Sequence, residues 1–145
     1  MNRFLRNPLF VMVFRVILGL IFSIAGFIKI QDPQSFADDI AGFQVLPKSL
    51  INLFALSLPP FEVLIGLALI LNWKKSTAAL GALFLSVIFT LALAQALVRG
   101  LPVDCGCFGS GTPSILRSWF SLGRDIILII GSAILYREVI KSAAA

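Results

Sequence analysis

Two cysteines, one residue apart, are the most reactive feature of this 145-residue sequence. Cys105 and Cys107 flank Gly106 in a segment rich in Gly and Pro that runs from 99 to 117. Thiols at this spacing can close a very small disulfide ring, and a ring with strained geometry is easier to reduce. Gly106 has no Cβ, so its backbone can take the angles that closure needs. The pair therefore predicts a disulfide that exchanges reversibly with another thiol.

Two other interpretations of the cysteines stay open. Soft thiolates bind copper or zinc, but two ligands in a chain without histidine are too few for a metal site unless a second chain completes it. We therefore predict no metal site within this chain alone. In the second interpretation, both thiols are inert and simply pack in a glycine-rich turn. Arg99 would favour a thiolate here, whereas Asp104 would oppose it.

Charged residues inside long apolar stretches form a second group. Such residues are expensive in a membrane and usually face the bundle interior, where they pair. Arg15 and Glu62 have opposite signs on neighbouring antiparallel stretches, which predicts that they pair. Arg124 and Asp125 point about 100° apart on a helix, so each is expected to have another partner. Lys29 is expected to extend to the membrane interface.

These charges have two interpretations. In the first, they hold the helices in register. In the second, they form a polar cluster in the outer half of the bundle that binds a ligand head group or carries protons to the cysteines. A quinone is the predicted ligand, and Phe108 would either stack on its ring or plug the loop onto the bundle. The predicted ligand-binding set is Arg15, Glu62, Arg99, Phe108, Arg124 and Asp125.

The elements that must position these residues follow from composition. Hydrophobic residues make up 59% of the chain and charged residues 13%, against about 45–50% and about 25% in soluble domains. A single domain of this size cannot bury so much apolar surface, so the excess must face lipid. This excludes a soluble enzyme and a disordered regulator. The net charge of +5 forms no basic patch, which excludes a nucleic-acid-binding module.

Four apolar stretches are long enough to cross a bilayer core of about 30 Å as helices. The predicted fold class is therefore all-α, an integral membrane four-helix transmembrane bundle that forms one domain over residues 1–145. The spans are expected at about 9–30, 50–71, 77–98 and 118–136.

The first loop between spans carries the signal of a further short helix. Asp32-Pro33 is a typical helix start, and Phe36, Ile40 and Phe43 follow at helical spacing. We predict an amphipathic helix that lies on the membrane surface and ends at Gly42 and Pro47.

Basic residues predict the orientation. One side of the four-span arrangement carries more of the Lys and Arg with a single acid, whereas the other carries several Asp. Because cytoplasmic loops are enriched in Lys and Arg, both termini are expected in the cytoplasm of an inner (plasma) membrane protein. The Cys-Gly-Cys loop then lies outside, on the oxidising side. The basic residues on the cytoplasmic side are Arg3, Arg6, Lys74, Lys75, Arg137 and Lys141.

Motifs through nearly the whole chain resemble the DoxX-like membrane proteins, and specifically the MauE family of methylamine utilisation proteins. The string Cys-Gly-Cys-Phe-Gly at 105–109 is the most specific of them. The others are Arg15 and Gly19, Gly26 to Lys29, Asp32-Pro33, Leu46-Pro47, Pro59 with Glu62, Arg99-Gly100, and Arg124-Asp125.

The resemblance implies a redox-associated membrane protein that helps to mature a disulfide-rich periplasmic enzyme with a thioredoxin-like periplasmic partner. We therefore expect a quinone-linked thiol–disulfide oxidoreductase without a covalently bound cofactor, acting as a homo-oligomer or a subunit of a complex. The alternative is a non-catalytic membrane scaffold, or a lipid-binding or metal-binding subunit. A transporter is a weaker expectation, because four spans show no inverted repeat.

Overall fold

The computed structural model describes residues 7–101, 103 and 115–144. Within these residues the chain forms helices and no strand, so the all-α prediction is confirmed for the described part. The four expected spans fall in the four longer helices. The helices are α2 (Pro8–Gln31), α3 (Pro33–Phe43), α4 (Lys48–Ile70), α5 (Lys75–Val98) and α6 (Ile115–Ala144).

Three of these helices, α2, α4 and α5, are long and apolar enough to cross a membrane. In each, no more than 33% of the most apolar 18-residue window is buried inside the protein, so most of its apolar side chains are left for lipid. The fourth expected span lies in α6, which is not among the three. Six charged residues occur along α6, against two along α2.

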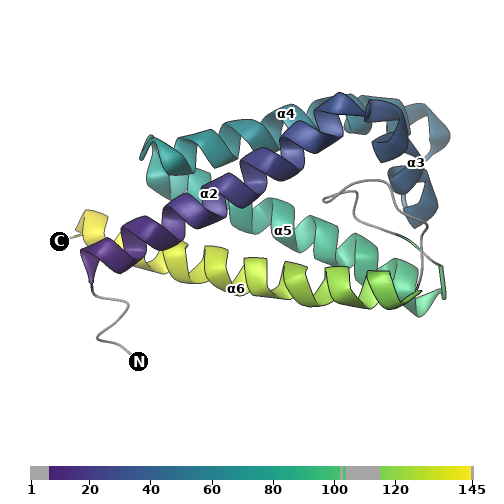
Figure 1. Cartoon of the computed structure of the whole chain (residues 1–145). Coiled ribbons are helices and arrows are strands. Elements are labelled where there is room, and N and C mark those ends of the chain that lie inside the picture. Colours follow the sequence, from purple (N-terminus) through teal and green to yellow (C-terminus); the bar gives the residue numbers. More distant parts are fainter. Residues whose placement is uncertain (1–6, 102, 104–114, 145) are drawn as a thin grey trace.

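The helices pack mainly in two pairs, α2 with α4 and α5 with α6 (Figure 1). Helix α3 lies at one end of the molecule, near the end of α5 and the start of α6. The start of α2 and the end of α6 lie at the opposite end. The cysteine segment, which joins α5 to α6, therefore begins and ends at the same end of the bundle as α3.

Local signals explain the bounds of α3. The Asp32 side chain accepts a hydrogen bond from the Ser35 amide at 3.0 Å, which caps the first turn as the sequence predicts. The helix ends at Phe43 because Gln44 takes a left-handed conformation with φ 52° and its amide donates to the Ala41 carbonyl. The helix ends between Gly42 and Pro47, as expected, although Gly42 itself is still helical.

The apolar face of α3 packs against the bundle. Phe36 and Ile40 form a buried cluster with Ala55 of α4. Phe43 packs with Leu93 of α5. The predicted amphipathic pattern is confirmed, and protein covers the apolar face. The position of this helix on the membrane surface stays a prediction.

Small residues bring α2 and α4 into direct backbone contact. A Cβ built on Gly19 would lie 2.7 Å from the Gly66 carbonyl oxygen, and one on Gly66 would lie 2.6 Å from the Gly19 oxygen. A Cβ on Gly26 would lie 2.8 Å from the Pro59 oxygen. Glycine commonly permits such close packing between membrane helices. These contacts fix which residues of the two antiparallel helices face each other.

The substitution Gly66→Ala should lower the free energy of unfolding by about 1–3 kcal/mol, because its methyl group would overlap the backbone of α2. Gly123→Ala is the matched control, since a Cβ at that position would have no neighbouring atom within 4 Å. That control should be neutral or stabilising by up to about 1 kcal/mol, as alanine favours helix. Denaturant titration in detergent measures both, and equal stability of the two variants would contradict the close contact.

Candidate functional site

A buried ion pair joins α2 to α4. The Lys29 ammonium donates to both oxygens of the Glu62 carboxylate, at 2.8 and 2.9 Å. Both residues are almost inaccessible, with exposed fractions of 2% and 3%. The expectation that Lys29 extends to the interface is therefore wrong, and so is the expectation that Glu62 pairs with Arg15.

Two aromatic rings complete the surroundings of Lys29. Its Nζ lies 4.9 Å from the ring centre of Phe36 in α3 and 4.5 Å from that of Phe89 in α5. A cation near a ring face is attracted by the ring quadrupole, more strongly where water is excluded. One ammonium group thus contacts side chains from three other helices.

Arg15 lies far from this pair along α2. Its guanidinium donates to the side-chain oxygen of Asn72, just beyond the end of α4. The contact between Gly19 and Gly66 explains both pairings, because it places Arg15 opposite the end of α4 and Lys29 opposite Glu62. The glycines were therefore the sequence signal that could have identified the true partner of Glu62.

The second ion pair lies within α6. Arg124 Nη2 and Nε lie 2.7 and 3.1 Å from Asp125 Oδ1. The prediction that these neighbours do not face each other is wrong. Their Cβ atoms do point in different directions, but the arginine side chain is long enough to fold back onto the next residue.

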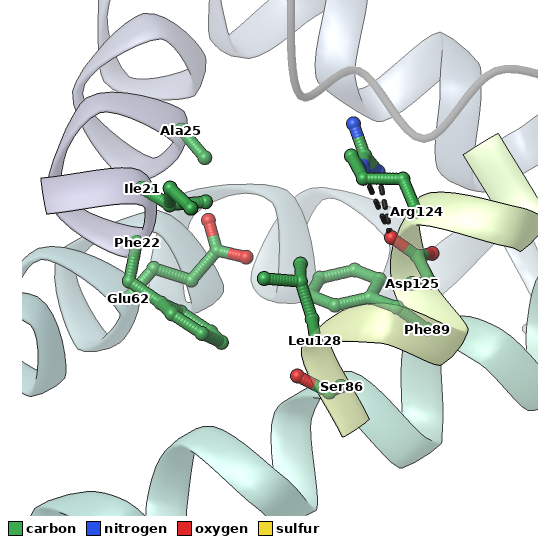
Figure 2. Close-up of a pocket in the computed structure, with 9 residues that line it drawn as sticks. All are labelled: Ile21, Phe22, Ala25, Glu62, Ser86, Phe89, Arg124, Asp125 and Leu128. Carbon is green, nitrogen blue, oxygen red and sulfur yellow. Dashed lines mark hydrogen bonds and ion pairs between the residues drawn. The ribbon is translucent and has the colours of Figure 1, made fainter. Parts of the chain in front are cut away.

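A small cavity of about 30 Å³ lies between α2, α4, α5 and α6 (Figure 2). It brings together three predicted site residues, Glu62, Arg124 and Asp125. Arg15 and Arg99 do not line it. Arg99 instead lies beside Gln95. With the side-chain amide of Gln95 turned so that its oxygen faces the guanidinium, Arg99 Nε and Nη1 donate to that oxygen at 2.8 and 3.2 Å. The lining residues are Ile21, Phe22, Ala25, Glu62, Ser86, Phe89, Arg124, Asp125 and Leu128.

The size of the cavity limits what it holds. A single water needs about 10–15 Å³ by this measure, so the cavity has room for one or two waters. A quinone ring is several times larger. The quinone thus stays a prediction from the sequence, and the cavity as it stands does not fit it.

The predicted residues Cys105, Cys107 and Phe108 lie outside the described residues. Described residues on either side of this segment contact each other. Val103 donates its amide hydrogen to the Ser118 hydroxyl at 3.3 Å, and that hydroxyl donates to the Val103 carbonyl. Both residues are buried. Hydrogen bonds therefore hold the chain just before the cysteine segment against the first turns of α6.

Apolar helices of spanning length around a buried ion pair define a membrane protein that is helical throughout its described residues. The family model "Methylamine utilisation protein MauE" matches residues 7–137, and the chain belongs to the MauE family.

Relatives from three organisms carry the name methylamine utilization protein MauE. The protein from Paracoccus denitrificans is 32% identical over 129 residues, which cover 88% of this chain and 69% of that protein. The protein from Methylorubrum extorquens is 33% identical over 129 residues, which again cover 88% of this chain and 69% of that protein. The protein from Methylophilus methylotrophus is 29% identical, with 88% and 68% covered. No solved structure matches the chain.

Proposed function

We propose that this MauE-family protein exchanges disulfides with a thioredoxin-like periplasmic protein during maturation of a disulfide-rich enzyme of methylamine utilisation. The observation that supports the proposal is the contact of the chain just before the cysteine segment with α6. Val103, two residues before Cys105, is hydrogen-bonded to Ser118 of α6. The described ends of the cysteine segment therefore lie at one end of the bundle, which supports the segment as the place of exchange.

The exchange moves two electrons and two protons. A thiolate of the partner attacks one sulfur of the Cys105–Cys107 disulfide, so a mixed disulfide forms and the other cysteine leaves as a thiolate. The second thiolate of the partner then attacks the mixed disulfide. The partner ends as a disulfide, and both cysteines of this chain end as thiols after protonation. The reverse reaction follows the same steps.

The orientation belongs to the same proposal. With α6 as the fourth span, both termini lie in the cytoplasm and the cysteine segment faces the periplasm. The charges of the described residues support this arrangement. Lys74, Arg137 and Lys141 belong to the segments expected inside, and Asp32 and Asp38 to the loop expected outside.

The double substitution Cys105→Ser/Cys107→Ser tests the exchange. In a host that lacks its own copy of the protein, it should abolish maturation of the disulfide-rich enzyme while the amount of membrane-inserted protein stays normal. Ser110→Ala in the same segment is the matched control and should retain full activity. Full activity of the double-serine variant would overturn the proposal.

A non-catalytic scaffold is the second candidate. The observation in its favour is the Lys29–Glu62 pair, whose ammonium contacts side chains of α3, α4 and α5, as a purely structural tie would. A scaffold predicts that the double-serine variant fails only because less protein accumulates. Raising its expression to the normal level would then restore activity.

A further inference from the structure

Two polar atoms beside the cavity have no hydrogen-bond partner within the described part of the chain. They are the Ser86 hydroxyl oxygen in α5 and Oδ2 of Asp125 in α6. Both residues are 4% exposed. Leaving a buried polar group unpaired destabilises the folded protein, and more so when the group is charged. Native proteins seldom leave such groups unpaired, so these two indicate a missing partner.

The same two residues line the cavity, together with Glu62. Figure 2 shows the Glu62 carboxylate directed into the space between the helices. Its two oxygens accept from Lys29, yet a carboxylate has about four acceptor positions, so some remain available. The rest of the wall is mostly side-chain carbon from Ile21, Phe22, Phe89 and Leu128.

Charge and size select the ligand. Lys29 and Arg124 balance the charges of Glu62 and Asp125, so the site has no net negative charge to attract a metal ion. The volume of about 30 Å³ has room for one or two waters. Water donates to carboxylate oxygens and accepts from a hydroxyl, which is what Asp125 and Ser86 require.

We propose that Glu62, Ser86 and Asp125 form an internal water-binding site that joins the Lys29–Glu62 and Arg124–Asp125 pairs into one hydrogen-bonded network. The site holds one or two waters and connects α4, α5 and α6 through the apolar bundle. It stands independently of the cysteine chemistry, because none of its residues belongs to the cysteine segment.

X-ray radiolytic footprinting of the protein in lipid nanodiscs tests this site directly. Radicals formed from a bound water oxidise the side chains beside it. The ring of Phe22 lines the cavity and is 5% exposed, whereas the ring of Phe43 is 4% exposed and does not line it. We expect several-fold more oxidation at Phe22 than at Phe43. Equal oxidation of the two rings would mean a dry cavity and would overturn the proposal.

Two variants assign the water to these residues. Ser86→Val removes the hydroxyl and fills the cavity, so Phe22 oxidation should fall to the level of Phe43. Thr90→Val is the matched control one turn along α5, because its hydroxyl is satisfied by the Ser86 carbonyl at 2.7 Å and does not line the cavity. Unchanged Phe22 oxidation in Ser86→Val would overturn the assignment. If Ser86→Val does not fold, the comparison of Phe22 with Phe43 oxidation in the unaltered protein still shows whether the cavity holds water.

Discussion

Glu62→Leu should lower the free energy of unfolding by about 3–5 kcal/mol, because it leaves the Lys29 ammonium buried without its carboxylate. The two neighbouring rings compensate only in part, since each cation–π contact contributes about 0.5–2 kcal/mol and is already present. Denaturant titration of the purified protein in detergent measures the loss.

A rescue and a control make this result specific. Lys29→Met/Glu62→Leu should recover most of the lost stability, since apolar residues of similar volume often replace a buried ion pair without penalty. The exposed pair Glu138–Lys141, at 3.3 Å, is the control, and Glu138→Gln should change stability by less than about 1 kcal/mol. A Glu62→Leu effect as small as that of the control would contradict the buried pair. Activity of the rescued double variant separates a structural role of these charges from a functional one.

Arg124→Met should destabilise the protein by about 3 kcal/mol or more, and by more than Asp125→Leu does. The asymmetry follows from burial. The Asp125 side chain is 5% exposed and the Arg124 side chain 23%. Removing the arginine leaves a deeply buried carboxylate, whereas removing the aspartate leaves a guanidinium that still reaches the surface. Unfolding titrations of the two single variants and of the double variant measure the order.

The reverse order, with Asp125→Leu the more harmful variant, would contradict this account of the pair. The double variant Arg124→Met/Asp125→Leu should lie closer to the unaltered protein than Arg124→Met does, because it leaves no unpaired carboxylate.

Composition and capping signals were enough to predict the helices. Apolar stretches of about 20 residues predict long helices. The bilayer core has no water to hydrogen-bond the backbone, so only a helix or a closed barrel can pair every backbone N–H and C=O group there. Asp32-Pro33 predicted the start of α3 because its signal is local. The end of α3 was harder to predict, because the left-handed residue is Gln44 and not the nearby glycine.

The partners of the buried charges could not be predicted in the same way. Pairing of Glu62 with Lys29 rather than Arg15 depends on how α2 lies along α4, which the glycine contact decides. The burial of Lys29 depends on α3, which brings Phe36 over the ammonium. Contact between Arg124 and Asp125 depends on the rotamer of a long side chain, which helical spacing does not specify. Local sequence patterns predict the individual helices, whereas these ion pairs depend on how the helices pack against one another.

Thiol trapping in intact cells tests most directly whether Cys105 and Cys107 form a labile disulfide on the outer face. Cells are treated with a membrane-impermeant maleimide before and after graded mild reduction, and the mass of the purified protein is read. Denatured protein labelled after full reduction is the control for complete reactivity. We predict that both cysteines are labelled only after mild reduction. Labelling that appears only after denaturation would mean buried or permanently bonded cysteines, and would contradict the proposed exchange.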